Sequence, residues 1–334
     1  MTHFALFGTP DGPAWLGVGP FTETTLAPPD ASAFYINDFS LSDPKPWKVP
    51  TTLIPLTRSA PAPELPADGP IHVRWVKPEM EWFKMAFRRI RKEIVAGRLE
   101  KMVPAVTDPG TLIEGDMGGL ARRVLALDHP AWCYGRVQGD TGFVGATPEL
   151  LFDLTPQHIQ TMALAGTAKP GGDAAFLRDT KEIDEHEIVV RYIVNQLSQW
   201  GAVEREPRTI RETAGLRHFQ SRLQVPTPMA VEPDELVHRL HPTPAVGSLP
   251  HTDEWRAKLV EYRQLLGVPG FFGAPFGLSH EGHVTMVVAI RGVTWKGNRV
   301  DLPSGCGIVA GSAFDHEWRE IRLKRDSIAK MLGL

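Results

Sequence analysis

Apolar positions along the chain follow two different spacings. A helical spacing runs from Pro78 to Gly97, where the apolar side chains are Trp82, Met85, Ala86, Ile90 and Ile94. Helices are also predicted over residues 179–200 and 312–332. Between the helices lie short β-rich stretches with the composition and spacing of strands, at 72–76, 99–106, 131–137, 142–147, 150–154, 158–164, 270–279, 283–297 and 299–311.

The order of these elements indicates the fold class. Gly, Asp and Pro turns separate the strands, which is typical of antiparallel sheet. The strands gather on both sides of the central helix and do not alternate with helices, so an α+β fold is favoured over a parallel-stranded arrangement.

Proline interrupts the pattern most densely between residues 41 and 70, where eight prolines occur. Such a segment is typical of a loop or linker. We therefore predict a short N-terminal portion at residues 1–75, packed on the core, and a main domain at residues 76–334.

Composition narrows the function classes. The 334 residues are 42% hydrophobic and 22% charged, and the net charge of −3 implies no surface for a polyanion, so nucleic acid is excluded as a partner. The two cysteines, Cys133 and Cys306, form no metal-binding or disulfide pattern. The first residues lack a basic leader and a long apolar run. We expect a cytoplasmic protein that does not span a membrane.

Two helices carry paired acidic residues. Glu182 and Glu185 are three positions apart and share a helix face, and Glu317 and Glu320 repeat the spacing near the end of the chain. A charge stripe of this kind is usually a solvated helix face. Both pairs, however, adjoin large apolar residues. Four facing carboxylates would repel one another without a cation, and this arrangement favours Mg²⁺.

Other metals fit the acidic helix less well. The stretch "HEIVV" begins like the zinc-protease signature HExxH, but Val190 stands where the second histidine is required. Di-iron chemistry needs a glutamate three positions before a histidine, and Ile183 stands at that place before His186.

Further polar residues stand in apolar surroundings. Lys101 lies in the apolar strand "LEKMVPA", and Glu149 follows a Thr-Pro turn between two strands. Taken singly, each is typical of a surface charge. The loops "LAGTAKPGG" and "LPSGCGIVAG" consist of small residues and can offer backbone N–H groups to an anion.

Taken together and in order, these motifs resemble the chorismate-utilising enzymes, a family that includes anthranilate synthase, aminodeoxychorismate synthase, isochorismate synthase and salicylate synthase. The resemblance covers roughly residues 78–334 and implies an α+β fold with two large antiparallel sheets packed together and helices outside. The matching stretches are "EKMVPA" (100–105), "GATPELL" (145–151), "ALAGTAKPGG" (163–172), "TKEIDEHEIVV" (180–190), "LHPTPAVGSLP" (240–250), "GFFGAPFGL" (270–278), "VVAIRGV" (287–293), "SGCGIVAGS" (304–312) and "EWREIRLK" (317–324).

The resemblance also assigns roles to residues. It implies a Mg²⁺ ion with Glu185 and Glu320 as direct ligands, and Glu182 and Glu317 completing the shell. It implies chorismate as the substrate, with Arg291 pairing with the enolpyruvyl carboxylate. It also implies further contacts in the substrate pocket, made by Gly166, Thr167, His218, Ala245, Gly305, Gly307 and Lys324.

Within the family, the resemblance points to water as the nucleophile. Enzymes that add water resemble this chain in having a lysine at Lys101, where ammonia users have glutamine, because water needs a general base. Glu149 is the matching general acid. Ala165 stands where aminodeoxychorismate synthases carry a lysine nucleophile. A Mg-dependent isochorismate synthase is therefore expected, acting as a monomer without a glutaminase subunit.

Alternatives within the family stay open. A salicylate synthase would add pyruvate elimination, but such enzymes carry threonine at Ala245 and tyrosine at Phe272. A degenerate relative that binds chorismate without turnover is a further reading. The family pattern is altered at Pro104, Val106 and Cys306. Whether isochorismate would serve menaquinone or siderophore biosynthesis is also left open.

Overall fold

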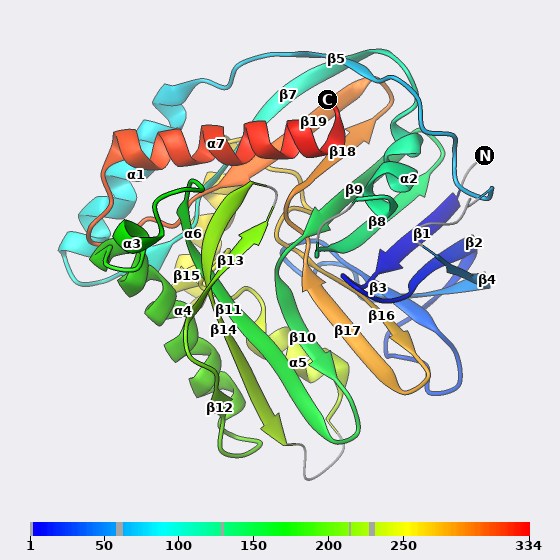
Figure 1. Cartoon of the computed structure of the whole chain (residues 1–334), viewed down its shortest axis with the longest axis horizontal. Coiled ribbons are helices and arrows are strands. Elements are labelled where there is room, and N and C mark those ends of the chain that lie inside the picture. Colours follow the sequence, from blue (N-terminus) through cyan, green and yellow to red (C-terminus); the bar gives the residue numbers. More distant parts are fainter. Residues whose placement is uncertain (1–2, 58–62, 128–129, 214, 227–230) are drawn as a thin grey trace.

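The computed structural model describes residues 3–57, 63–127, 130–213, 215–226 and 231–334 (Figure 1). Every pairing between its described strands is antiparallel, and the pairings join the strands into one series that forms two layers. The strands of the first layer, in spatial order, are β5 (His72–Trp75), β7 (Ala105–Glu114), β19 (Arg299–Gly305), β18 (Gly292–Lys296), β9 (Thr141–Thr147), β8 (Trp132–Gln138) and β1 (His3–Gly8).

The second layer continues the same series. Its strands are β3 (Ala33–Ile36), β16 (Pro275–His280), β17 (His283–Val288), β10 (Leu150–Leu154), β11 (His158–Ala168) and β14 (Leu216–Pro226), with β12 (Glu204–Arg205) and β13 (Thr209–Thr213) both beside β14. Two long strands connect the layers, because β2 (Ala14–Thr24) pairs with β1, and β4 (Trp47–Leu56) pairs with both β2 and β3. A short separate pair consists of β6 (Lys101–Met102) and β15 (Ser248–Leu249).

The two layers pack face to face through buried aromatic side chains. Phe7 of β1 and Tyr134 of β8 contact Phe276 of β16, at ring-centroid separations of 6.4 and 5.7 Å. All three side chains are at most 2% exposed and belong to one apolar cluster. Packing of two antiparallel sheets around a shared apolar interior is the arrangement of a β-sandwich.

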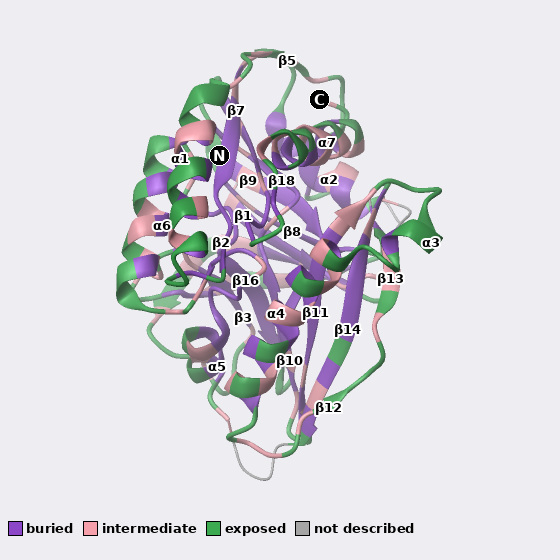
Figure 2. Cartoon of the chain, turned by 90° about the vertical axis from the view of Figure 1, so that its left-hand side faces the viewer, coloured by how far each residue is buried: buried purple, intermediate pink, exposed green. Residues whose placement is uncertain are grey.

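Helices cover the outer faces of this sandwich, as Figure 2 shows for the exposed helices around the buried strands. One apolar cluster joins the second layer to α1 (Met80–Val95), α4 (Thr180–Leu197), α5 (Pro233–Leu240) and α6 (Asp253–Leu265). Another joins the first layer to α2 (Leu120–Leu125), which follows the 3₁₀ turn Met117–Gly119, and to the end of α7 (Phe314–Leu332). The short α3 (Asp173–Phe176) lies before α4. The predicted α+β fold, with two packed antiparallel sheets and outer helices, is confirmed.

The predicted helix at 78–97 forms, but its buried face is rotated. Trp82, which we expected in the core, is 46% exposed. Phe83 and Phe87 are buried in its place, and Phe83 contacts Phe314 and Trp318 of α7 at 6.0 and 5.6 Å between ring centroids. These contacts hold α1 beside the helix that carries the second acidic pair.

The proline-rich segment is only in part the loop or linker that we expected. Its prolines do not prevent a strand, and β4 occupies residues 47–56. Strand β1 pairs with β8 and strand β3 pairs with β16, so strands from residues 1–75 continue the sheets of the main domain. Physically, the buried aromatic positions of β3 and β4, such as Tyr35 and Trp47, outweigh the local preference of proline for loops.

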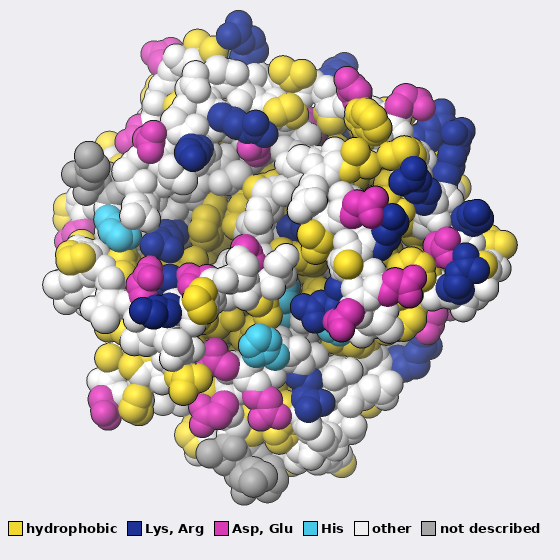
Figure 3. All heavy atoms as spheres, turned by 180° about the vertical axis from the view of Figure 1, so that it is seen from behind, with side chains coloured by type: hydrophobic (Ala, Val, Ile, Leu, Met, Phe, Trp, Pro, Cys, Tyr) yellow, Lys and Arg dark blue, Asp and Glu magenta, His cyan; other side chains and the backbone are white. Residues whose placement is uncertain are grey.

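Surface composition agrees with the low net charge. On the face drawn in Figure 3, basic and acidic side chains are interspersed. Among the described residues, no helix has both the length and the hydropathy required to cross a membrane.

Candidate active site

A hollow with about 670 Å³ of empty volume lies among β11, β14, α4, α7 and the ends of β17 and β19. Hollows with mixed polar and apolar walls are typical of small-molecule sites. Most of the residues singled out in the sequence line it: Glu149, Gly166, Thr167, Glu185, His218, Ala245, Arg291, Gly305, Gly307 and Lys324.

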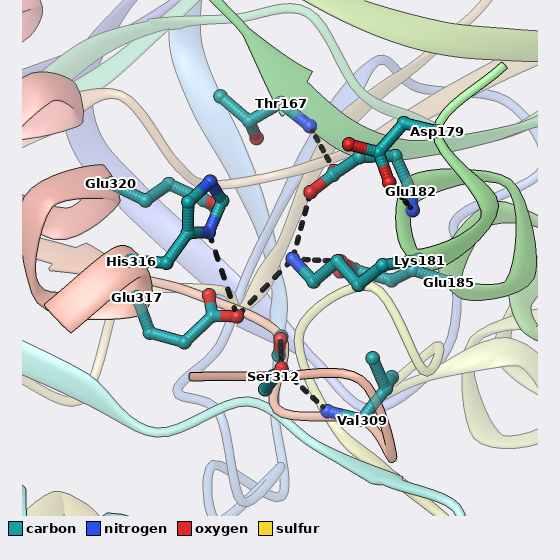
Figure 4. Close-up of polar contacts among 12 residues, drawn as sticks. Thr167, Asp179, Lys181, Glu182, Glu185, Val309, Ser312, His316, Glu317 and Glu320 are labelled. Carbon is teal, nitrogen blue, oxygen red and sulfur yellow. Dashed lines mark hydrogen bonds and ion pairs between the residues drawn. The ribbon is translucent and has the colours of Figure 1, made fainter. Parts of the chain in front are cut away.

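The two acidic helices meet beside this hollow (Figure 4). Asp179 caps the first turn of α4 by accepting a hydrogen bond from the backbone N–H of Glu182 (3.3 Å), which fixes where the acidic face begins. Glu182 and Glu320 line an adjoining hollow that Thr167 shares with the first. Both carboxylates are buried, so neither acidic pair is the solvated stripe that charge patterns usually indicate.

Several of these groups are placed to hold a cation. One ligand atom from each of Glu182, His316 and Glu320 lies within 4.8 Å of the others. Glu317 is fully buried, with Oε1 3.2 Å from the ammonium of Lys181, and the Oε2 atom of Glu320 is buried with no hydrogen-bond donor among the described residues. Such orphaned carboxylate oxygens are costly unless a cation compensates them. Carboxylate oxygens are also the ligands that Mg²⁺ prefers, so the donor set fits a hard divalent cation.

Lys181 stands among the glutamates, although the sequence did not single it out. Its Nζ atom lies 2.9 Å from Glu182, 3.4 Å from Glu185 and 3.2 Å from Glu317. Burial opposes its charge, but the surrounding carboxylates outweigh this effect and raise the pKa of Lys181, which is therefore an ammonium. The sequence did carry a signal, since Lys181 precedes Glu185 by one helical turn.

The pKa values of the two glutamates of α4, Glu182 and Glu185, are shifted in opposite directions. Burial and the charge of Glu185 raise the pKa of Glu182. Burial alone would raise the pKa of Glu185 as well, but Lys101 and Lys181 outweigh it and hold that pKa below its usual range. Glu185 is therefore an anion with two lysine partners.

Lys101 contacts Glu185 from within the protein interior and is not among the residues that line the hollow. The two side chains form an ion pair of 2.8 Å, and Lys101 is fully buried. The adjacent Gly307 is the residue that makes room for this pair. A Cβ atom at that position would lie 2.1 Å from an oxygen of Glu185 and 2.6 Å from Cε of Lys101, so a larger residue would displace both.

At the α7 side, Lys324 connects the second acidic pair to the hollow. Its Nζ atom donates to Glu320 at 2.6 Å and to the carbonyl of Gly305 at 3.0 Å. The predicted residues Gly305, Glu320 and Lys324 are therefore in direct contact.

Arg291 and His218 form a second polar pair in the hollow. Arg291 donates from Nη2 to Nε2 of His218 at 3.1 Å, and the His218 Nδ1 atom donates to the carbonyl of Gly166 at 2.7 Å. Burial and the charge of Arg291 lower the pKa of His218 well below its ordinary value, so the imidazole is neutral. Arg291 has φ 59°, an unusual value for a residue with a Cβ, and such strain is typical of functional positions.

Glu149 is also buried, at 4% exposure, and is not the surface charge that its sequence position suggests when it is taken singly. Burial raises its pKa to about 7, and the positive charges of Lys101 and Lys324 and a hydrogen bond with Thr243 oppose this shift only in part. Near neutral pH the carboxyl group therefore exchanges a proton readily.

The small-residue loop at 163–172 offers its backbone N–H to an anion, as we predicted, but this anion is a residue of the chain. The N–H of Thr167 donates to Oε2 of Glu182 at 2.7 Å. Gly166 lies at an irregularity in the pairing of β11 with β14, where its φ of 73° favours glycine.

The departures from the family pattern have local explanations. Pro104 falls in the gap between β6 and β7, where its missing N–H breaks no ladder hydrogen bond. Val106 is buried in the core, and Cys306 is a buried residue of the hollow.

Comparisons with known proteins agree with this site. Residues 56–333 match the family model described as "Chorismate binding enzyme". Over 249 residues, the chain is 32% identical to "Salicylate biosynthesis isochorismate synthase" of Pseudomonas aeruginosa, a match that covers 71% of this chain and 52% of that protein. Over 273 residues it is 28% identical to "Isochorismate synthase EntC" of Escherichia coli K12, covering 77% and 68%.

A solved structure has the same fold. The menaquinone-specific isochorismate synthase MenF from Escherichia coli superposes with a TM-score of 0.81 at 19% identity, covering 99% of this chain and 88% of that one. The chain thus matches only about half the length of the Pseudomonas protein. The family resemblance drawn from the motifs is confirmed.

Proposed function

Because the chain belongs to the chorismate-binding enzyme family, we propose that it converts chorismate to isochorismate by adding water at C2 with loss of the C4 hydroxyl. The observation that carries the proposal is the contact between Lys101 and Glu185 beside the hollow, with Glu149 on its wall. This places the lysine expected of water-adding relatives next to a carboxylate of the acidic cluster, and a titratable carboxyl group in the same cavity.

The cavity walls would bind the two carboxylates of chorismate separately. Arg291 has an Nη1 atom that is buried without an acceptor, and burial lowers its pKa only to about 10, so it is charged and has an unused donor. We assign it to the enolpyruvyl carboxylate. Glu185 and Glu320, supported by Glu182 and Glu317, would hold a Mg²⁺ ion that binds and polarises the ring carboxylate.

We assign the general base and the general acid of this reaction to two residues of the chain. Lys101 would act as the neutral amine, so the ammonium of the Lys101–Glu185 ion pair first loses a proton to solvent. The amine then takes a proton from the water that attacks C2, and Glu149 gives a proton to the hydroxyl that leaves C4. Isochorismate formation is reversible, and the two residues exchange roles in the return direction. Each step moves one proton between a named side chain and an oxygen atom, which is ordinary general acid–base catalysis.

Three wall residues support the choice of water over an amine as nucleophile and of isochorismate as the final product. Ala165 lines the cavity and supplies no amine that could attack the ring. Ala245 and Phe272 also line it, at the positions where the family resemblance places threonine and tyrosine in salicylate synthases. We propose that the chain acts as a cytoplasmic monomer and needs no glutaminase subunit.

Loss of Arg291 is expected to weaken substrate use. Arg291→Ala should lower kcat/KM for chorismate at least tenfold, because truncating one partner of a buried charge pair typically costs about 2–5 kcal/mol. Steady-state kinetics at saturating Mg²⁺ would measure this. Arg299→Ala is the matched control, since Arg299 is 64% exposed and pairs with Asp301. A change below twofold in Arg291→Ala would place the carboxylate elsewhere.

The pH dependence should report the proton on Glu149. Its raised pKa of about 7 keeps the carboxyl protonated below that value, so kcat/KM should fall as the pH rises through about 7. The positive groups facing it are Lys101, Lys324 and Arg291.

A substitution beside Glu149 tests the assignment. Thr243→Val removes a hydrogen bond that favours the charged carboxylate, so it should move the descending limb of the kcat/KM profile to higher pH. A limb that does not move, or moves to lower pH, would show that another group controls it.

Product analysis tests the proposed reaction directly. Purified protein incubated with chorismate and Mg²⁺ should yield isochorismate in a chromatographic separation that also resolves salicylate, anthranilate and aminodeoxychorismate. Salicylate with pyruvate would favour the salicylate synthase alternative, and recovery of chorismate alone would favour a binding protein without turnover.

A further inference from the structure

The ammonium of Lys181 lies inside the carboxylate cluster that the proposed function assigns to Mg²⁺. Figure 4 shows its nitrogen between α4 and α7, pointing toward Glu182 and Glu317. The contacts of 2.9 Å to Glu182 and 3.2 Å to Glu317 join the two helices through one positive charge. A lysine that only covered the surface would not reach glutamates on both helices.

Each of the other lysines of the cluster pairs with a single glutamate. Lys101 pairs with Glu185, and Lys324 pairs with Glu320. Among the described residues, Lys181 is the one with ion pairs to three of the four glutamates. It therefore provides the central positive charge of the cluster.

A Mg²⁺ ion held by this cluster would compete with the ammonium for carboxylates that Lys181 contacts, namely Glu185 among the proposed direct ligands and the supporting residues Glu182 and Glu317. Mg²⁺ requires oxygen ligands at about 2.0–2.1 Å, closer than the ammonium approaches them. Two positive charges within a few ångströms also repel one another in a partly buried site. Lysine can leave, because its charge sits on a flexible four-carbon stem, and Lys181 keeps 14% of its side chain exposed.

We propose that Lys181 is an internal counter-ion, which neutralises the acidic cluster when metal is absent and must withdraw when Mg²⁺ binds. Lys181 is then a positioning residue. It keeps the acidic faces of α4 and α7 together in the metal-free protein, and it lowers the affinity for the metal. This inference rests on the metal site of the proposed function.

Calorimetric titration of the metal-free protein with MgCl₂, without chorismate, tests the idea. Lys181→Met should bind Mg²⁺ at least tenfold more tightly than the wild type, because no ammonium has to be displaced. Lys181→Arg restores the positive charge and should return the affinity toward the wild-type value. Lys169→Met is the control, because Lys169 is exposed beside the adjoining hollow and solvent screens its charge. It should change the affinity less than twofold.

Thermal unfolding provides a second readout. Metal-free Lys181→Met should have a lower Tm than the wild type, and saturating Mg²⁺ should remove most of the difference. Equal loss of Tm with and without Mg²⁺, or unchanged or weaker Mg²⁺ binding in Lys181→Met, would overturn the counter-ion role. Failure of every variant to bind Mg²⁺ would overturn the metal site together with that role. The predicted Mg²⁺ affinities without any turnover of chorismate would support the counter-ion and reject only the reaction.

Discussion

Replacing Lys101 by glutamine is expected to lower the rate of isochorismate formation by about 10²–10⁴-fold, the usual contribution of a general base. The side chain is fully buried beside Glu185, and the substitution removes the group that accepts the proton from water. The same variant should slow the return reaction equally, because Lys101 serves both directions. Initial rates with chorismate and with isochorismate would measure the two effects.

Glutamine at this position also imitates the ammonia-using relatives. We expect high ammonium concentrations to restore some turnover of Lys101→Gln as an aminated product, since ammonia needs no base. Lys92→Gln is the control on folding and on surface charge, because Lys92 is exposed on α1. A normal rate of isochorismate formation by Lys101→Gln, with an unchanged Tm, would exclude Lys101 as the base.

Replacing Glu320 by glutamine is expected to abolish turnover while leaving the fold intact. The substitution preserves shape but removes one of the charges that would hold Mg²⁺, and it frees Lys324 from its 2.6 Å partner. If the metal supplies about 4 kcal/mol of charge stabilisation, the rate should fall about a thousandfold or more. Calorimetry should show a parallel loss of Mg²⁺ affinity.

A control substitution at another acidic residue of α7 distinguishes the loss of Mg²⁺ binding from a general loss of negative charge. Asp326→Asn also removes an acid from α7, but Asp326 is exposed and should leave both the rate and Mg²⁺ binding unchanged. Circular dichroism and Tm would establish that Glu320→Gln is folded. Full activity of the wild type in excess chelator, or a Glu320→Gln enzyme as active as Asp326→Asn, would remove the metal from the mechanism.

The acidic pairs were predictable from the sequence because helix periodicity alone puts residues three apart on one face. The contacts between side chains that are distant in the sequence were not predictable in this way. Lys181 acquires its role from Glu317, more than a hundred positions away, and no local pattern records that contact. The burial of Glu149 likewise depends on residues from other elements, including Thr243 and Arg291.

The secondary structure also divides into elements that the local sequence predicts and elements that depend on distant parts of the chain. Short strands of the main domain followed from their spacing and turns. The N-terminal strands did not, because Pro50 and Pro55 hide the pattern of β4, whose pairing with β2 and β3 is decided by the rest of the sheet. In α1, Trp82 and Phe83 offered two overlapping apolar faces, and packing against α7 selected the second.

The source of the new oxygen atom tests the central claim most directly. Chorismate and Mg²⁺ should be incubated with the protein in ¹⁸O-labelled water. The products should then be separated and their masses determined by mass spectrometry. Attack by water activated at Lys101 predicts isochorismate that carries one heavy oxygen, at C2. Isochorismate without the label would mean that the hydroxyl moved within the molecule and that water is not the nucleophile.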